Sequence, residues 1–323
     1  MLCARRYKSI LIFAAAVACS FPAQAQTYPN KPVRLVVPFA PGGSTDIMAR
    51  ILGQKLSEMW AQQVVVDNRA GGGTIIGTEL TVNSPPDGYT IMLANIALAL
   101  NPGLHAKLPY DPVRDLAPVI LIASQATALA ATPSLPANSV KELVAVAKSK
   151  PGGLTFGSSG TGGVGHIAGE MFRGAVGAEF VHVPYKGGGP AAVDVMAGQI
   201  PIAFISLPSV MTHFKAGKLK VLAITDSKRS AAAPDIPTIG ETVPGFAVNN
   251  WIGLLAPART PKELIQKLNA DTTKAIRMPD AKEKLSSQGF DIQGSTPEQF
   301  AAVIRNDIAK YAKVIRQAGI REN

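Results

Sequence analysis

The sequence predicts an α/β protein of two lobes, each built on a mostly parallel sheet flanked by helices. Apolar strands alternate with amphipathic helices along the chain, and repeated strand–helix units build parallel sheets with helices on both faces. The chain has 323 residues, and a chain of that length usually divides its core into two. The apolar stretch 118–133 is about twice an ordinary strand in length, as expected of a strand that passes between lobes, and 247–257 is suited to the return.

The first 25 residues have the pattern of a cleaved signal peptide. A basic head over residues 5–8 precedes a short apolar run, and Ala23-Gln24-Ala25 is a small-residue cleavage site. Cleavage there predicts a periplasmic protein that begins at Gln26. Lipidation at Cys19 is an alternative, although Ala16 stands where a lipoprotein signal has a larger aliphatic residue.

Composition excludes several classes of function. Both cysteines, Cys3 and Cys19, lie in the predicted signal peptide, so the exported protein would have no disulfide and no cysteine nucleophile. The formal net charge of +10 favours anionic ligands. The basic residues do not cluster with aromatic ones, so we predict no nucleic-acid partner. No later segment is apolar for long enough to span a membrane.

The first elements after the signal peptide follow from hydrophobic spacing. Residues 33–37 predict a strand, 47–60 a helix with one apolar face, and 63–67 the next strand. Pro41-Gly42-Gly43 separates the first strand from the helix. Such a junction leaves backbone N–H groups at the positive end of a helix, where a small anion can bind.

The same device recurs in the middle of the chain. Residues 154–165 predict a strand and a Gly/Ser-rich turn, followed by a helical run over 166–172. Further strands are expected over 180–183 and 198–204. Ligands of open parallel sheets sit at the carboxyl ends of strands, where both glycine-rich turns fall. Two anion sites of this kind suggest a clamp around a small acid.

Three later helices are predicted from capping boxes, in which a Ser or Thr N-cap is followed three residues later by Glu or Gln. The second and third boxes also have Pro at the first helical position. The pairs are Ser139 with Glu142, Thr260 with Glu263, and Thr296 with Gln299.

The lobes are expected to divide the chain discontinuously. We assign residues 26–125 and 247–323 to the first lobe and 126–246 to the second. The Pro-rich segment 233–238 precedes the return, so the return crossover is placed within 225–255.

Two glycine motifs in the sequence resemble motifs of enzymes. Gly160-x-Gly162-x-x-Gly165 has the spacing of a dinucleotide fingerprint, but no acidic residue ends the strand 180–183, where a ribose contact is needed. Gly157-Ser-Ser-Gly160 resembles a nucleophile elbow with Thr161 in place of the last glycine. Three histidines outside these motifs show no metal-ligand spacing. We therefore predict no enzyme activity, no cofactor and no metal.

Several ordered motifs give the chain a family resemblance. They are Tyr28-Pro-x-Lys-Pro-Val-Arg-Leu-Val-Val-Pro-Phe-Ala-Pro-Gly-Gly-x-x-Asp46, Asn68-Arg-Ala-Gly-Gly-Gly73, Gly157-Ser-Ser-Gly160, His166-Ile-Ala-Gly-Glu170, Val183-Pro-Tyr-Lys-Gly187, Pro237-Thr238 and Trp251-x-Gly-Leu-x-Ala-Pro257. With the signal peptide, they resemble the Bug/TctC family, the periplasmic solute receptors of tripartite tricarboxylate transporters. The resemblance covers essentially the whole mature chain and implies the type II periplasmic-binding-protein (Venus flytrap) fold.

The resemblance also implies a function. A receptor of this family captures a small mono-, di- or tricarboxylate in the cleft between its lobes and delivers it to the transporter's membrane subunits. We expect a monomer. The alternative is a receptor that reports its ligand to a membrane sensor kinase.

The resemblance places the ligand between two backbone loops that hold a carboxylate through main-chain N–H groups and ordered water. Neither glycine-rich turn contains Lys or Arg, which agrees with binding by amide donors. The candidate ligand-binding residues are Ala40, Pro41, Gly42, Gly43, Ser44, Thr45, Asp46, Ser158, Ser159, Gly160, Thr161, His166, Tyr185, Lys186, Gly187, Ile205 and Ser206.

Some of these residues have a simpler structural interpretation. Asp46 suits the first turn of a helix, and Ser44 and Thr45 suit an N-cap. His166 could equally be a structural histidine. The glycines at 71–73 would make either a third ligand loop or a plain turn, and a turn is the simpler interpretation.

One position departs from the family pattern. Relatives commonly have Asp followed by Asn or Ser where this chain has Ile205-Ser206. An acidic group that could meet a ligand amine is replaced by an aliphatic one. This disfavours an amino-acid ligand.

Overall fold

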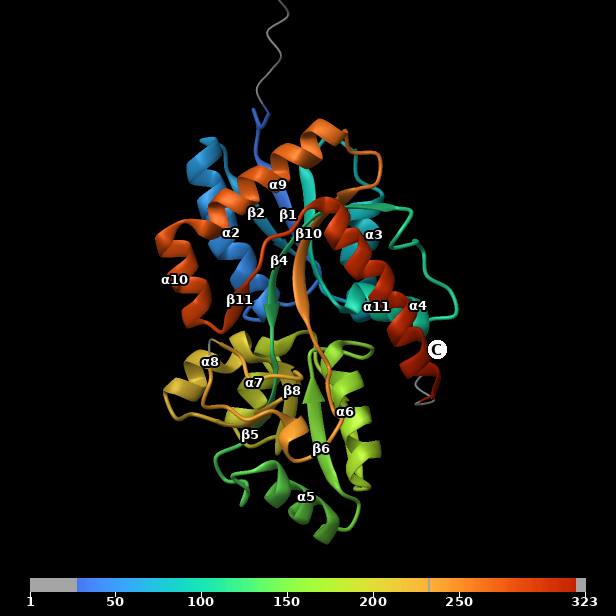
Figure 1. The fold of residues 1–323 in the computed structure, drawn as a ribbon, viewed down its shortest axis with the longest axis vertical. Helices are drawn as coiled ribbons and strands as arrows, with labels where there is room; N and C mark the ends of the chain where they lie inside the picture. The colour runs from blue at the N-terminus through green and yellow to red at the C-terminus, as the bar shows by residue number, and fades with distance from the viewer. Residues whose placement is uncertain (1–27, 232, 318–323) are drawn as a thin grey trace, which may run out of the picture. The chain divides into compact units, whose positions relative to one another are not determined.

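The computed structural model describes residues 28–231 and 233–317. The predicted signal peptide and its cleavage site lie outside the described residues. The described residues from Lys31 onward belong to one compact unit, which contains all the elements below. Figure 1 shows the elements with their labels.

The first sheet has the strand order β11-β4-β10-β3-β1-β2. β1 is parallel to β2 and β3, while β10 is antiparallel to β3 and β4, and β11 is antiparallel to β4. β1 to β4 therefore run one way, and β10 and β11 run the other. The strands are β1 (Val33–Val37), β2 (Val64–Asn68), β3 (Thr90–Asn95), β4 (Leu116–Gln125), β10 (Trp251–Pro257) and β11 (Phe290–Ile292).

The second sheet has the order β7-β6-β8-β5-β9. β6 is parallel to β7 and β8, whereas β5 is antiparallel to β8 and β9. Each sheet is thus mixed but has most of its strands in one direction, as predicted. The strands are β5 (Thr127–Ala131), β6 (Leu154–Ser158), β7 (Phe180–Pro184), β8 (Ile202–Ser206) and β9 (Lys220–Ile224).

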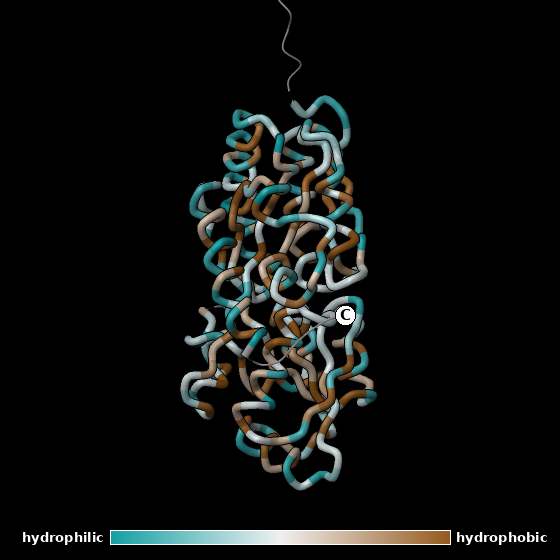
Figure 2. Tube along the Cα trace, turned by 90° about the vertical axis from the view of Figure 1, so that its right-hand side faces the viewer, coloured by the Kyte–Doolittle hydropathy of each residue, from teal (hydrophilic) through white to brown (hydrophobic). Residues whose placement is uncertain are grey.

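Helices cover both sheets, and hydrophobic segments gather inside each of the two lobes (Figure 2). In the first lobe α2 packs on β1 and β2, and α11 packs on β4 and α4. Its helices are α2 (Ser44–Trp60), α3 (Ile75–Val82), α4 (Ala97–Leu104), α9 (Lys262–Arg277), α10 (Pro279–Ser287) and α11 (Pro297–Gln317), with the 3₁₀ helix η1 (Gly72–Thr74). The second lobe has α5 (Val140–Ser149), α6 (Val164–Val176), α7 (Gly188–Met196), α8 (Leu207–Lys215) and η2 (Ile239–Glu241).

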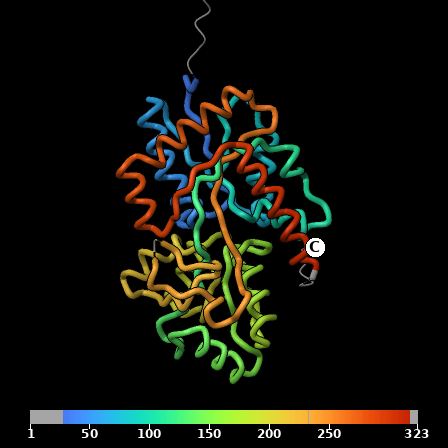
Figure 3. The backbone as a smooth tube through the Cα atoms, viewed as in Figure 1, coloured from blue at the N-terminus to red at the C-terminus, as the bar shows by residue number. Residues whose placement is uncertain are grey.

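The chain crosses between the sheets at the predicted apolar stretches (Figure 3). The stretch 118–133 forms two strands in different sheets, because β4 ends at Gln125 and β5 begins at Thr127. The Gln125 N–H donates to the Asn250 carbonyl, so the outgoing and returning segments lie together. The lobe boundaries at 125/126 and 246/247 stay a prediction. The division of the strands between the two sheets supports it.

Local signals placed most elements closely. β1 has the predicted bounds, and α2 begins at Ser44 instead of residue 47 because the helix starts directly after the glycine turn. β8 is Ile202–Ser206, shifted toward the C-terminus from the predicted 198–204. These shifts move element ends and leave the order of elements unchanged.

Two of the three predicted capping boxes supply a cap. The Thr296 hydroxyl accepts from the Gln299 N–H, and the Gln299 side chain accepts from the Thr296 N–H. The Ser139 hydroxyl accepts from the N–H three residues later. The box at Thr260 is wrong, because its hydroxyl donates to the Pro257 carbonyl and Pro261 itself occupies the N-cap of α9.

Candidate functional site

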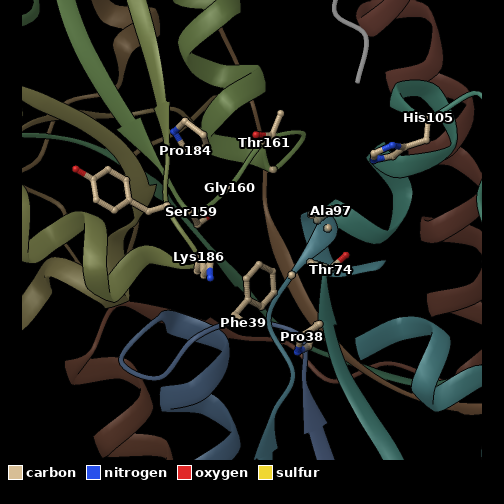
Figure 4. Close-up of a pocket in the computed structure, with 15 residues that line it drawn as sticks. Pro38, Phe39, Thr74, Ala97, His105, Ser159, Gly160, Thr161, Pro184 and Lys186 are labelled. Carbon is tan, nitrogen blue, oxygen red and sulfur yellow. The ribbon is translucent and has the colours of Figure 1, made fainter. Parts of the chain in front are cut away.

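A cavity of about 660 Å³ lies where the strands of both sheets end. In Figure 4, Ser159, Gly160 and Thr161 lie on one side of it, and Thr74, Ala97 and His105 on the other. Among the described residues, none of those lining it is Asp or Glu, whereas Lys186 contributes a cation. The lining residues are Pro38, Phe39, Gly71, Gly72, Gly73, Thr74, Ala97, His105, Ser159, Gly160, Thr161, Gly163, Pro184, Tyr185 and Lys186.

The turn between β6 and α6 is held by its own hydrogen bonds. The Ser158 hydroxyl donates to the Gly160 carbonyl at 2.9 Å and accepts from the Gly160 N–H at 3.2 Å. Gly160 and Gly162 have φ of 144° and 70°, a region in which glycine is favoured because it lacks a Cβ. The turn therefore presents a fixed backbone to the cavity.

Two stacked histidines support this turn from behind. The rings of His166 and His182 lie 4.0 Å apart at 13°. His166 Nδ1 accepts from the Gly162 N–H at 3.1 Å, and His182 Nε2 lies 2.7 Å from the Ser158 hydroxyl. Burial lowers the pKa of both rings, and the neighbouring His166 helps to lower the pKa of His182 to about 3. Both rings are therefore neutral at pH 7, and His166 positions the turn.

The turn over residues 40–46 is engaged by the protein itself. The Ala40 N–H donates to the Lys186 carbonyl at 2.9 Å, and the Ser44 N–H donates to the Ser209 hydroxyl at 2.9 Å. Neither Ala40 nor Ser44 is among the residues that line the large cavity. Three members of the turn, Gly43, Ser44 and Thr45, instead line a void of about 10 Å³. In this structure the predicted first anion site is a contact between the lobes.

Asp46 stabilises that turn. Its carboxylate accepts from the Gly42 N–H, the Arg50 guanidinium and the Asn68 amide. Burial raises the pKa of Asp46, but these hydrogen bonds outweigh burial and hold the pKa below its usual 3.8. The side chain is only 3% exposed. The geometry is that of a first-turn helix stabiliser.

The glycine turn at residues 71–74 opens on the cavity instead. Gly71, Gly72 and Gly73 all have positive φ, and so does Thr74, at 88°. A non-glycine residue in this region is strained, and such strain concentrates at functional sites. The buried Asn101 amide donates to the Gly73 carbonyl and the Thr74 hydroxyl, both at 3.2 Å. The turn that the sequence favoured as plain thus lines the cavity.

Of the remaining candidates, two line one of these spaces and two line neither. Tyr185 lines the cavity, but its hydroxyl donates to Asp194 at 2.6 Å, and burial, followed by this carboxylate, raises its pKa to about 12. Ser206 lines the small void, and Gly187 packs against Ala40. Ile205 is 1% exposed in the apolar core of the second lobe, and it is not among the residues that line either space.

Sequence reasoning missed several lining residues. Pro38 and Phe39 follow β1, Pro184 ends β7, Ala97 begins α4 just after β3, and His105 follows α4. For all but His105 the one local signal is position, because the residues at the ends of parallel strands gather at the ligand edge of a sheet. His182 gave no signal, since a histidine within a strand reveals nothing about the ring it will stack on.

Two further findings concern membrane-spanning helices and metal-binding groups in the described chain. No helix within 28–231 and 233–317 is both long and apolar enough to cross a bilayer. Over those same residues, no group of three or more His, Asp or Glu is arranged to hold a metal.

The described residues form a two-lobed α/β fold with a cavity at the strand ends of both sheets, which is the architecture of periplasmic-binding proteins. A model of the tripartite tricarboxylate transporter family receptor, TctC, matches residues 48–320. The chain is 36% identical over 313 residues to protein BugT of Bordetella pertussis, with 96% of each chain covered. The chain therefore belongs to the Bug/TctC family of periplasmic receptors, as its motifs predicted.

Solved structures agree with this assignment. A periplasmic transporter protein superimposes with a TM-score of 0.88 at 41% identity, covering 91% of this chain and 99% of the other. Rpa4515 of R. palustris, solved with adipate, gives a TM-score of 0.88 at 34% identity, covering 91% and 100%. The predicted periplasmic-binding-protein fold is confirmed.

Proposed function

We propose that the protein captures a small carboxylate in the 660 Å³ cavity and delivers it to the membrane subunits of a tripartite tricarboxylate transporter. The observation that carries the proposal is the lining of the cavity. Two glycine-rich turns and Lys186 face it, and no Asp or Glu of the described chain does. Such a lining suits an anion, because backbone donors replace its hydration while no negative charge opposes it.

The second lobe supplies the positive end of a helix. Gly163, the N-cap of α6, lines the cavity and has no side chain with which to cap the helix. The first N–H groups of a helix lack intrahelical partners, and the helix dipole favours an anion there. Residues 159–161 precede this end, so we place one carboxylate beside them.

The first lobe supplies a more varied wall. The turn at 71–74 offers backbone donors, while Phe39, Pro38 and Ala97 are apolar. A carboxylate with a short carbon chain fits such a lining, with ordered water in the remaining volume. Because a structural relative was solved with adipate, adipate is a suitable first probe.

Calorimetry with adipate and dimethyl adipate tests the proposal. We expect one-to-one binding of the diacid and at least tenfold weaker binding of the diester, because a neutral ligand leaves buried donors poorly paired, at about 1–3 kcal/mol each. Equal affinity for both compounds would refute carboxylate recognition. If neither binds, native mass spectrometry of freshly purified protein should reveal a co-purified acid, and a protein free of any acid would count against the proposal.

Delivery to a transporter is tested in the bacterium of origin. Deleting the gene should abolish uptake of the acid identified in vitro, and a plasmid copy should restore it. Normal uptake in the deletion strain, with loss of a transcriptional response to the acid, would favour the sensor-kinase role. Purified protein should return the acid chemically unchanged, since we propose capture without catalysis. We also propose that the receptor is a monomer.

A further inference from the structure

A buried hydrogen bond joins the two lobes beside the ligand cavity. Ser209 belongs to α8 of the second lobe, and Ser44 is the first residue of α2 in the first lobe. The Ser44 N–H donates to the Ser209 hydroxyl at 2.9 Å, and the two residues are 5% and 6% exposed. The Ser209 hydroxyl thus takes the place that an anion or an N-cap side chain would fill at the start of α2.

Glycines bring the lobes close enough for this bond. A Cβ on Gly188 would lie 2.8 Å from the Ser209 hydroxyl, and a Cβ on Gly189 would lie 2.9 Å from the Pro41 carbonyl. Real Cβ atoms do not approach so closely, so the turn of the first lobe rests on a surface without side chains. The contact between the lobes therefore explains Gly187 and Gly189, which approach Ala40 and Pro41, while Gly188 leaves room for the Ser209 side chain within its own lobe.

A second hydrogen bond crosses at the same place. The Ala40 N–H donates to the Lys186 carbonyl at 2.9 Å. This bond involves only main-chain atoms, so no substitution at Ser209 changes it chemically. Ala40 is consequently an independent reporter of whether the lobes touch.

The outer side of α8 makes a contrasting contact. The Thr212 hydroxyl lies 3.3 Å from the Gln288 amide oxygen, and the Lys215 ammonium lies 2.8 Å from the Ser287 carbonyl. Both contacts are exposed, and water competes for exposed polar groups. They should contribute little to holding the lobes together.

We propose that Ser209, seated on the Gly188-Gly189 surface, is a latch that holds the two lobes closed without help from the ligand. Ser209 is not among the residues lining the large cavity, so it acts as a positioning residue. A latch of this kind sets how often the closed receptor opens. It therefore governs the rate of ligand release.

Amide hydrogen exchange on the ligand-free protein tests the latch. The wild type is compared with Ser209→Ala and with Thr212→Ala, a matched loss of a hydroxyl one turn further along α8. We expect the Ala40 and Ser44 amides to exchange about fivefold faster or more in Ser209→Ala, as the loss of one buried hydrogen bond implies. Thr212→Ala should match the wild type, and the Leu35 amide in β1 checks that neither change unfolds the protein.

Two other outcomes overturn the latch, and a third requires a second variant. Faster exchange at Ser44 alone would mean that Ser209 only caps α2, and unchanged exchange at both amides would mean that the bond does not hold the lobes. If Leu35 also accelerates, Gly189→Ala provides the second variant, because its Cβ separates the turns without removing a hydrogen bond. Unchanged Ala40 exchange in Gly189→Ala would then refute the proposal. Because no ligand is present, these results do not depend on the proposed function.

Discussion

The buried carboxyl of Asp226 has an unusual environment for an ionisable residue. Burial, followed by the nearby charge of Asp291, raises its pKa to about 7 against the partial compensation of backbone N–H groups. One carboxyl oxygen has no hydrogen-bond partner among the described residues. Asp226 follows β9 and receives the Thr127 N–H, so it lies where the chain passes between the sheets.

We expect Asp226→Asn to stabilise the protein at pH 8 and to have little effect near pH 3. The folded state binds the proton more tightly than the unfolded state, whose pKa is near 3.8. The favourable contribution of the protonated carboxyl is therefore present below pH 3.8 and is lost as the pH rises to about 7. Urea unfolding at both pH values should give a gain on the order of 2–4 kcal/mol at pH 8. A gain of equal size at both pH values would contradict this account.

The contribution of the stacked histidines to stability has the opposite pH dependence to that of Asp226. Because burial lowers the pKa of His182 from 6.5 to about 3, the unfolded state takes up a proton first as the pH falls. The stability that comes from the neutral ring is therefore present above pH 6.5 and is lost progressively toward pH 3. We expect the unfolding free energy of the wild type to fall more steeply than that of His182→Gln between pH 6.5 and 4.5, by up to about 1.4 kcal/mol per pH unit.

Urea unfolding of both proteins across that range checks this expectation. The contribution of Asp226 is common to both and cancels in the difference. Parallel pH profiles would show that the His182 ring is not held neutral by its surroundings.

Among the elements, the two glycine-rich turns that follow β1 and β6 differ in what they face. The turn before α2 faces Lys186 and Ser209, and the turn before α6 faces the cavity. The turn at 71–74 joins the second of these on the cavity wall. The conformation of that turn depends on one side chain behind it, Asn101.

We expect Asn101→Ala to weaken adipate binding about tenfold, because the 71–74 turn loses the amide that fixes the Gly73 carbonyl and the Thr74 hydroxyl. Calorimetry measures the change. The matched control is Tyr110→Phe. It removes the Tyr110 hydroxyl, which accepts from the Asn101 amide at 3.2 Å, and leaves the contacts of Asn101 with the turn intact. Unchanged affinity in Asn101→Ala would mean that the turn does not contribute to the site, and an equal loss in both variants would mean that the loss does not arise from the contacts with the turn.

For the whole molecule, cleavage of the predicted signal peptide would decide which residues the mature protein contains. We expect protein recovered from the periplasm to begin at Gln26, because the small-residue site ends at Ala25. Such a protein has lost Cys3 and Cys19 and contains no thiol. Intact mass spectrometry and a thiol assay check both statements, and a mass that includes lipid on Cys19 would refute them.

The sequence alone determined the family and a part of the elements. β1, β2 and the boxes at Ser139 and Thr296 follow from hydrophobic period and capping chemistry, which act over a few residues. The glycine turns were also found locally, because a positive φ at such positions favours glycine. Short-range rules of this kind need no knowledge of the remaining fold.

Only the tertiary structure decided which turn faces the large cavity. The turns at 40–46 and 158–163 have similar local signatures, but what lies against each turn depends on partners that are distant in sequence. The one that closes the first turn is the hydroxyl of Ser209, which is 165 residues from Ser44 in sequence. Likewise, Thr74 ends η1 and His105 follows α4, yet both line the same cavity. Such meetings are set by tertiary packing, for which no local pattern in the chain provides a signal.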